Sequence, residues 1–169
     1  MNYKKTVAAG VMTAAAAALQ VFEETLPVPV PVPGGKLGAA NIVTLTVMKL
    51  YGVKYAFAVC AVRSVLGCLL RGGISALPYS LGGAVFSCFV CAVMMKYCRG
   101  FTLTGIGVAS ALAHNFAQVA SAAVILQNAG VFSYYPILML ISVPCGIFTG
   151  LASGYITRNI KYKEGDFFE

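Results

Sequence analysis

The sequence has little charge and lacks tryptophan. Only 10% of its 169 residues are charged, five are acidic, and Asp166 is the single aspartate. A lone aspartate cannot form the carboxylate cluster that holds Mg²⁺ on a diphosphate. No GxxxxGK[ST] loop is present to bind nucleotide phosphates. The absence of tryptophan also excludes a ligand pocket built from tryptophan rings.

The sequence is instead rich in long apolar stretches. Hydrophobic residues make up 59% of the chain. Its charged fraction of 10% is far below the value of about 25% that is typical of soluble domains. About 20 apolar residues cross roughly 30 Å of hydrocarbon. We therefore expect an all-α integral membrane protein that forms one membrane domain over residues 1–169. The predicted elements are six transmembrane helices and a cytoplasmic tail: residues 6–22, 39–51, 55–70, 78–95, 102–127 and 134–156, followed by 157–169.

The basic residues predict the orientation of these spans. With both termini in the cytoplasm, the outer loops hold Lys36 and Arg71, and Arg63 lies within the membrane. This asymmetry agrees with the positive-inside rule. The net charge of +7 forms no patch with interleaved aromatics, so we expect no nucleic-acid partner. The predicted cytoplasmic side collects nine basic residues: Lys4, Lys5, Lys49, Lys54, Lys96, Arg99, Arg158, Lys161 and Lys163.

The first span has two interpretations. Its basic start and TAAAAA run resemble a secretory signal peptide, but we expect the span to be retained. Gly10, Ala14 and Ala18 then lie four residues apart on one helical face, where small residues let another helix approach closely. This face serves either packing within the bundle or docking of a partner helix.

A proline-rich segment follows the first span. The alternating prolines of residues 26–33 predict an extended strut, because each fixes φ and removes an amide donor. Gly34 and Gly35 permit a sharp turn after it, and Lys36 follows. The segment is either a plain spacer or a lid over an outward-facing cavity. The second span, residues 39–51, is too short to cross the membrane unaided, so we expect it to be tilted, re-entrant or buried among the other helices.

Polar groups interrupt the apolar spans at two similar depths. Arg63 and His114 each lie about 12 to 20 Å from the nearest helix ends, at roughly 1.5 Å per residue. An ionisable group at this depth costs at least about 2.5 kcal/mol and is a functional candidate. The competing interpretation is structural, because amides often bridge membrane helices. We predict that five residues line a cavity for a small polar or amphipathic ligand: Asn41, Arg63, His114, Asn115 and Gln118.

The remaining chemistry-bearing residues predict packing. Cys88 and Cys91 form a CxxC inside a span, where a thiol behaves as a small apolar side chain. The six cysteines and the single histidine lack the spacing of a zinc site. We therefore expect neither a metal nor a cofactor. The glycine pairs at residues 72–73 and 82–83 serve either loops over the cavity or close helix packing.

Several motifs resemble one family over almost the whole chain. They are PGGKLGAANIVTL, AVRSVLGCLLRGG, SLGGAVFS and GVASALAHNFAQ, followed by YYPILML. In this order they look like the Gx transporter family, also labelled heptaprenyl diphosphate synthase component I. KLGxAN and AHNxxQ are the most specific pieces, and ASAL before AHN departs from the family pattern.

This family is similar to the substrate-binding S components of energy-coupling factor (ECF) transporters. The resemblance implies a six-helix protein of the bacterial cytoplasmic membrane, surrounded by lipid, that binds a vitamin-like small molecule. From the residues, we expect Arg63 to neutralise an anionic group of this ligand, such as a carboxylate or phosphate. The resemblance also implies that Gly10, Ala14 and Ala18 dock a transmembrane T component, which works with two ATPase subunits. With its single aspartate, the chain is not expected to be an enzyme. The alternative is a noncatalytic membrane subunit, linked either to heptaprenyl diphosphate or quinone synthesis or to flavin-based extracellular electron transfer.

Overall fold

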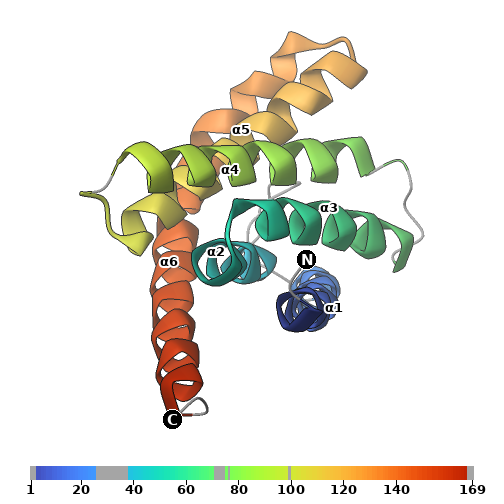
Figure 1. Ribbon diagram of the computed structural model, residues 1–169. Helices are drawn as coiled ribbons and strands as arrows, with labels where there is room; N and C mark the ends of the chain where they lie inside the picture. The colour runs from blue at the N-terminus through green and yellow to red at the C-terminus, as the bar shows by residue number, and fades with distance from the viewer. Residues whose placement is uncertain (1–2, 26–37, 71–74, 76, 99, 167–169) are drawn as a thin grey trace.

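The computed structural model describes residues 3–25, 38–70, 75, 77–98 and 100–166, which form helices and no strand (Figure 1). The proline-rich strut predicted for residues 26–33, the turn after it and the glycines at 72–73 lie outside these residues. The helices are α1 (Tyr3–Thr25), α2 (Ala39–Tyr51), α3 (Val53–Leu70), α4 (Leu77–Tyr97), α5 (Leu103–Ile125), the 3₁₀ helix η2 (Ala129–Tyr134) and α6 (Tyr135–Asp166).

The prediction of an all-α membrane protein is confirmed in its general form. Within the described residues, five helices are long and apolar enough to cross a membrane, namely α1, α3, α4, α5 and α6. Many of their large apolar side chains face outward, such as Leu140, Leu151 and Val124. In a bilayer these side chains contact lipid tails. Helix α6 extends to Asp166, so it continues through most of the segment predicted as a tail.

Helix α2 is short and packs inside the molecule. It has 13 residues, and the run Thr44–Met48 is buried throughout. It packs against α1, α3 and α6. Its second half is held to α6 by a hydroxyl pair, in which the Thr46 and Ser153 oxygens lie 3.0 Å apart. Of the arrangements expected for this segment, the structure shows burial among the other helices.

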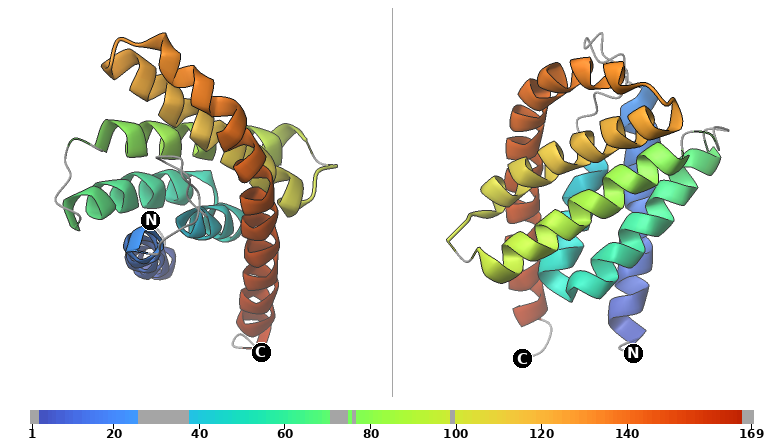
Figure 2. Two further views of the ribbon diagram at one scale, coloured as in Figure 1. Left: turned by 180° about the vertical axis from the view of Figure 1, so that it is seen from behind. Right: turned by 90° about the horizontal axis from the view of Figure 1, so that it is seen from above.

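Glycines allow the backbones of α5 and α6 to pack directly against each other. A Cβ added at Gly107 would lie 2.5 Å from the carbonyl oxygen of Gly146, and one at Gly150 would lie 2.5 Å from the Cα of Thr104. Side chains at these positions would force the helices apart. The two helices therefore run side by side, as the two views of Figure 2 show.

Helix α6 changes direction along its length. Pro144 lies inside the helix, where proline removes one backbone hydrogen bond and clashes with the preceding turn. Figures 1 and 2 show the upper part of α6 packed along α5 and the lower part turned away from it. The bend separates Ser142 from Cys145 and Thr149, the three residues of α6 that line the cavity described below.

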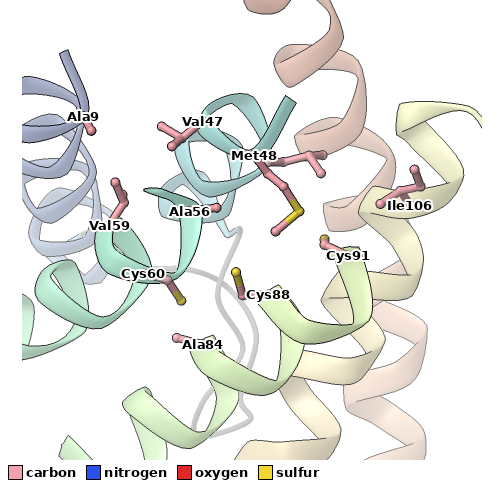
Figure 3. Packing of buried hydrophobic residues seen from close by; sticks show 11 residues of the cluster. Ala9, Val47, Met48, Ala56, Val59, Cys60, Ala84, Cys88, Cys91 and Ile106 are labelled. Atoms are coloured by element: carbon pink, nitrogen blue, oxygen red, sulfur yellow. The ribbon is translucent and has the colours of Figure 1, made fainter. Parts of the chain in front are cut away.

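The apolar core lies where α2, α3 and α4 meet. Buried sulfur atoms contribute to it: Cys60 of α3 and Cys88 of α4 point toward one another, with Cys91 one turn along α4 (Figure 3). All six cysteines are free thiols. The cluster of buried apolar residues, called the apolar cluster below, consists of Ala9, Leu45, Val47, Met48, Ala56, Val59, Cys60, Ala84, Cys88, Cys91 and Ile106.

Candidate binding cavity

All six α-helices contribute to one polar cavity. It lies near the end of the molecule where α1 ends and where α2 and α4 begin. Its volume is about 40 Å³, which is room for a few water molecules or a small ion. It is lined by Gln20, Glu23, Gly38, Ala40, Asn41, Arg63, Ser80, Ala111, His114, Asn115, Ser142, Cys145 and Thr149.

Arg63 is the buried cation of this cavity. Its residue is 4% exposed. Nη2 donates to Asn41 Oδ1 at 2.7 Å, and Nη1 donates to Gln20 Oε1 at 3.4 Å. Both acceptors are neutral amides, and Nε is buried without a hydrogen-bond partner among the described residues. The guanidinium, which has five N–H donors, therefore has donor capacity at Nε that no described residue uses.

Glu23 is the buried anion of this cavity. It is 5% exposed, and both carboxylate oxygens accept from the start of α2. Gly38 N lies 2.6 Å from Oε1, and Ala39 N lies 3.0 Å from Oε2. Gly38, the residue before α2, has φ 78° and has no side chain with which to cap the helix. The carboxylate thus satisfies amides that a helix start leaves open, and it lies at the positive end of the helix dipole.

His114 reaches the cavity from α5 beside a glycine of α4. A Cβ added at Gly83 would lie 3.1 Å from His114 Cε1 and 2.9 Å from Gln118 Cγ. Gly83 therefore makes room for both side chains where α4 and α5 pack. The glycines at 82–83 serve this close packing and not a loop over the cavity.

Asn115 ties α5 to α6 at the cavity wall. Its Nδ2 donates to Ser142 Oγ at 2.7 Å, and Ser142 Oγ in turn donates to Leu138 O at 2.6 Å. All three of these residues are buried. Asn115 thus has a structural bond that fixes the wall, while the residue also lines the cavity.

The structure brings together four of the five residues predicted to bind a ligand. Asn41, Arg63, His114 and Asn115 line the cavity, and Gln118 does not. One turn beyond His114, Gln118 faces Gly83 of α4 instead. Besides Asn41, the amide that bonds Arg63 is that of Gln20. Sequence reasoning also missed Glu23, which lies just beyond the predicted span 6–22 but three residues from Gln20 on one face of α1.

The predicted docking face lies on the outside of α1. Gly10, Ala14 and Ala18 are exposed, and nothing lies within 4 Å of a Cβ added at Gly10. Next to this face, α1 and α3 enclose a groove of about 620 Å³ that includes Gly10. The groove is lined by Thr6, Ala9, Gly10, Thr13, Lys54, Tyr55, Ala58, Val59 and Val62.

Fold and site together define a multi-pass helical membrane protein with a small internal polar cavity. The heptaprenyl diphosphate synthase component I family matches residues 12–156, and the chain belongs to this family. The comparisons with curated proteins and with solved structures gave no match. The resemblance noted in the sequence is therefore confirmed at the level of the family. The family description names a component of a synthase, which agrees with a noncatalytic role for this chain.

Proposed function

We propose that this protein is the substrate-binding S component of an ECF-type importer and that it binds a small acidic molecule in the polar cavity. The observation that carries the proposal is Arg63. A buried guanidinium that is bonded to neutral amides, with a buried Nε left over, is costly to keep within a membrane. An acidic ligand group would offset this cost by a charge-assisted, two-pronged contact.

The size of the cavity restricts how such a ligand binds. A volume of about 40 Å³ is well below the roughly 300–1,000 Å³ of typical small-molecule sites. The acidic group alone fits among Arg63, Asn41 and His114. The rest of a vitamin-sized ligand requires movement of the helix ends around the cavity, where α1 ends and α2 and α4 begin. Binding is thus coupled to a change in shape.

The α1 face would dock the T component of the importer. Its small residues are exposed, and the adjoining groove gives a partner helix room to approach. Energy for transport would come from the two ATPase subunits, since this chain has no phosphate-binding loop.

Affinity purification from the native membrane tests the partner side of this proposal. We expect a T component and two ATPases to be recovered with the protein. Gly10→Leu should abolish recovery, because a large side chain occupies the space that a closely packed partner helix needs. Val11→Leu, at an exposed neighbouring position, should retain recovery. Equal recovery with both variants would remove α1 as the docking face.

The family description supports a second candidate function at least as well. Membership in the heptaprenyl diphosphate synthase component I family favours a noncatalytic membrane subunit of prenyl diphosphate or quinone synthesis, and the flavin-based electron-transfer role is a variant of it. Under this candidate, the same purification recovers a prenyl synthase or redox proteins and no ATPases. A polyprenyl chain is also far too large for the cavity, so it would have to bind on the lipid-facing surface.

A further inference from the structure

The start of α2 and the Arg63 guanidinium form one corner of the cavity. Arg63 bonds to Asn41 in the first turn of α2 and to Gln20 on α1. Glu23, one turn after Gln20 on α1, bonds to Gly38 and Ala39. Backbone amides, a helix dipole and a guanidinium therefore converge on a small volume. Each of them favours an oxyanion.

A carboxylate of the protein already occupies part of this corner. Glu23 uses both of its oxygens on the two amides, which is how a bound carboxylate ligand would be held. It leaves the neighbouring Arg63 bonded to neutral amides, with Nε buried and without a hydrogen-bond partner among the described residues. The corner therefore has capacity for a carboxylate that Glu23 does not use in full.

We propose that Glu23 holds the place of the ligand's carboxylate, and that an incoming carboxylate displaces it from the start of α2. This inference rests on the proposed binding function and specifies the acidic group as a carboxylate. Because Glu23 is attached to the same chain, its effective concentration is high, and a simple carboxylate in solution cannot replace it. A ligand succeeds by adding a contact to Arg63 Nε, which has no hydrogen-bond partner among the described residues.

Displacement of Glu23 also transmits the binding event along α1. The two hydrogen bonds of Glu23 tie the end of α1 to α2, and the face of Gly10, Ala14 and Ala18 is on the same helix. A loaded cavity releases this tie and changes how α1 sits on its neighbours. Ligand binding in the cavity thereby shifts α1 between two positions, and this shift moves the docking face.

Chemical rescue of a Glu23→Ala variant tests the proposal with acetate as the probe. Thermal unfolding of the full chain in detergent is followed with a thiol-reactive fluorophore, since five of the six cysteines are buried until the protein unfolds. We expect the Tm of Glu23→Ala to fall by roughly 3–8 °C, because a helix cap is lost. Acetate should restore at least half of the loss, whereas chloride at equal ionic strength should not.

Two further variants identify where acetate acts. In Glu23→Ala/Arg63→Gln the acetate rescue should disappear, because the guanidinium of the corner is missing. Glu23→Gln keeps the shape of the side chain without its charge, and its Tm should rise more with acetate than that of the unaltered protein. Rescue that persists without Arg63, rescue by phosphate but not acetate, or failure of acetate to recover either Glu23 variant would overturn the proposal.

These measurements need neither the natural ligand nor a partner protein. Their failure is therefore distinguishable from failure of the transport function, which is judged by the small molecule and the subunits that accompany the protein. Loss of ATPase recovery combined with successful acetate rescue would leave the carboxylate corner in place and reassign its use.

Discussion

The apolar cluster and the polar cavity are two parts of the same helix assembly, and they meet on α3. Cys60 belongs to the apolar cluster, and Arg63, one turn later, belongs to the cavity. The cluster is filled with small and branched apolar side chains and thiols (Figure 3). The cavity collects a guanidinium, a carboxylate, an imidazole and three side-chain amides. The same helices thus hold two environments of opposite character.

This difference indicates that the apolar cluster stabilises the fold, whereas we propose that the polar cavity binds a ligand. Close packing is sufficient for helices to associate in lipid, and the apolar cluster provides it without charge. Buried charges are a poor way to gain stability, because their desolvation offsets most of the attraction. The Arg63 guanidinium is therefore better explained by the ligand proposed above than by folding, whereas Glu23 caps the start of α2 and Asn115 fixes the wall through Ser142.

The largest expected effect comes from placing the same carboxylate in each environment. Val47→Asp puts a charge in the fully buried part of the apolar cluster and should cost about 3 kcal/mol or more, enough to prevent folding. Ala111→Asp puts it in the cavity, where Arg63 offsets its charge, and should cost less than about 1 kcal/mol. Yield of monodisperse protein and Tm in detergent measure both. Equal damage from the two variants would mean that the cavity is no better suited to an anion than the apolar cluster.

A smaller and opposite pair of effects should follow from removing side chains. Val47→Ala leaves a void in close packing and should lower stability by about 1–2 kcal/mol. Glu23→Gln/Arg63→Met removes both buried charges of the cavity together and should raise stability by about 1 kcal/mol, whereas removing Arg63 alone would leave the Glu23 carboxylate uncompensated. The comparison uses Tm without added ligand. A loss of stability in Glu23→Gln/Arg63→Met as large as that in Val47→Ala would assign the two charges to the structure of the bundle.

The smallest expected effect is at the cavity wall. Ser142→Ala removes the acceptor of the Asn115 hydrogen bond and should lower stability by about 0.6 kcal/mol, a typical value between membrane helices. A matched control is Ser133→Ala, since Ser133 is exposed. Double-mutant analysis with Asn115→Ala measures the coupling of the pair. Coupling near zero would show that the bond contributes nothing to the wall.

Sequence reasoning predicted the parts of this molecule that depend on local composition. The length and apolarity of the helices follow from the solvent in which they lie, and residues 39–51 coincide with α2 because Gly38 and Gly52 border an apolar run. Arg63 and His114 could be identified because ionisable groups are rare at such depth. Their common cavity required a structure, although it is consistent with their similar depths.

Other features depend on how the helices rotate against each other. The role of Glu23 could not be predicted, because its partners Gly38 and Ala39 lie 15 and 16 residues further on. Gln118 was grouped with His114 from their spacing, but a turn of helix was enough to move it from the cavity to the packing surface at Gly83. Ser142 gains its role from a helix crossing that depends on Gly107 and Gly146. None of these relations is encoded in a short stretch of sequence.

Native mass spectrometry of the gently purified protein, compared with Arg63→Ala, tests the central claim most directly. We predict that the unaltered protein carries a small acidic molecule in addition to lipid, and that Arg63→Ala is folded and carries lipid alone. The same bound mass in both proteins, or lipid alone in both, would contradict the claim that Arg63 is kept in the cavity for a ligand.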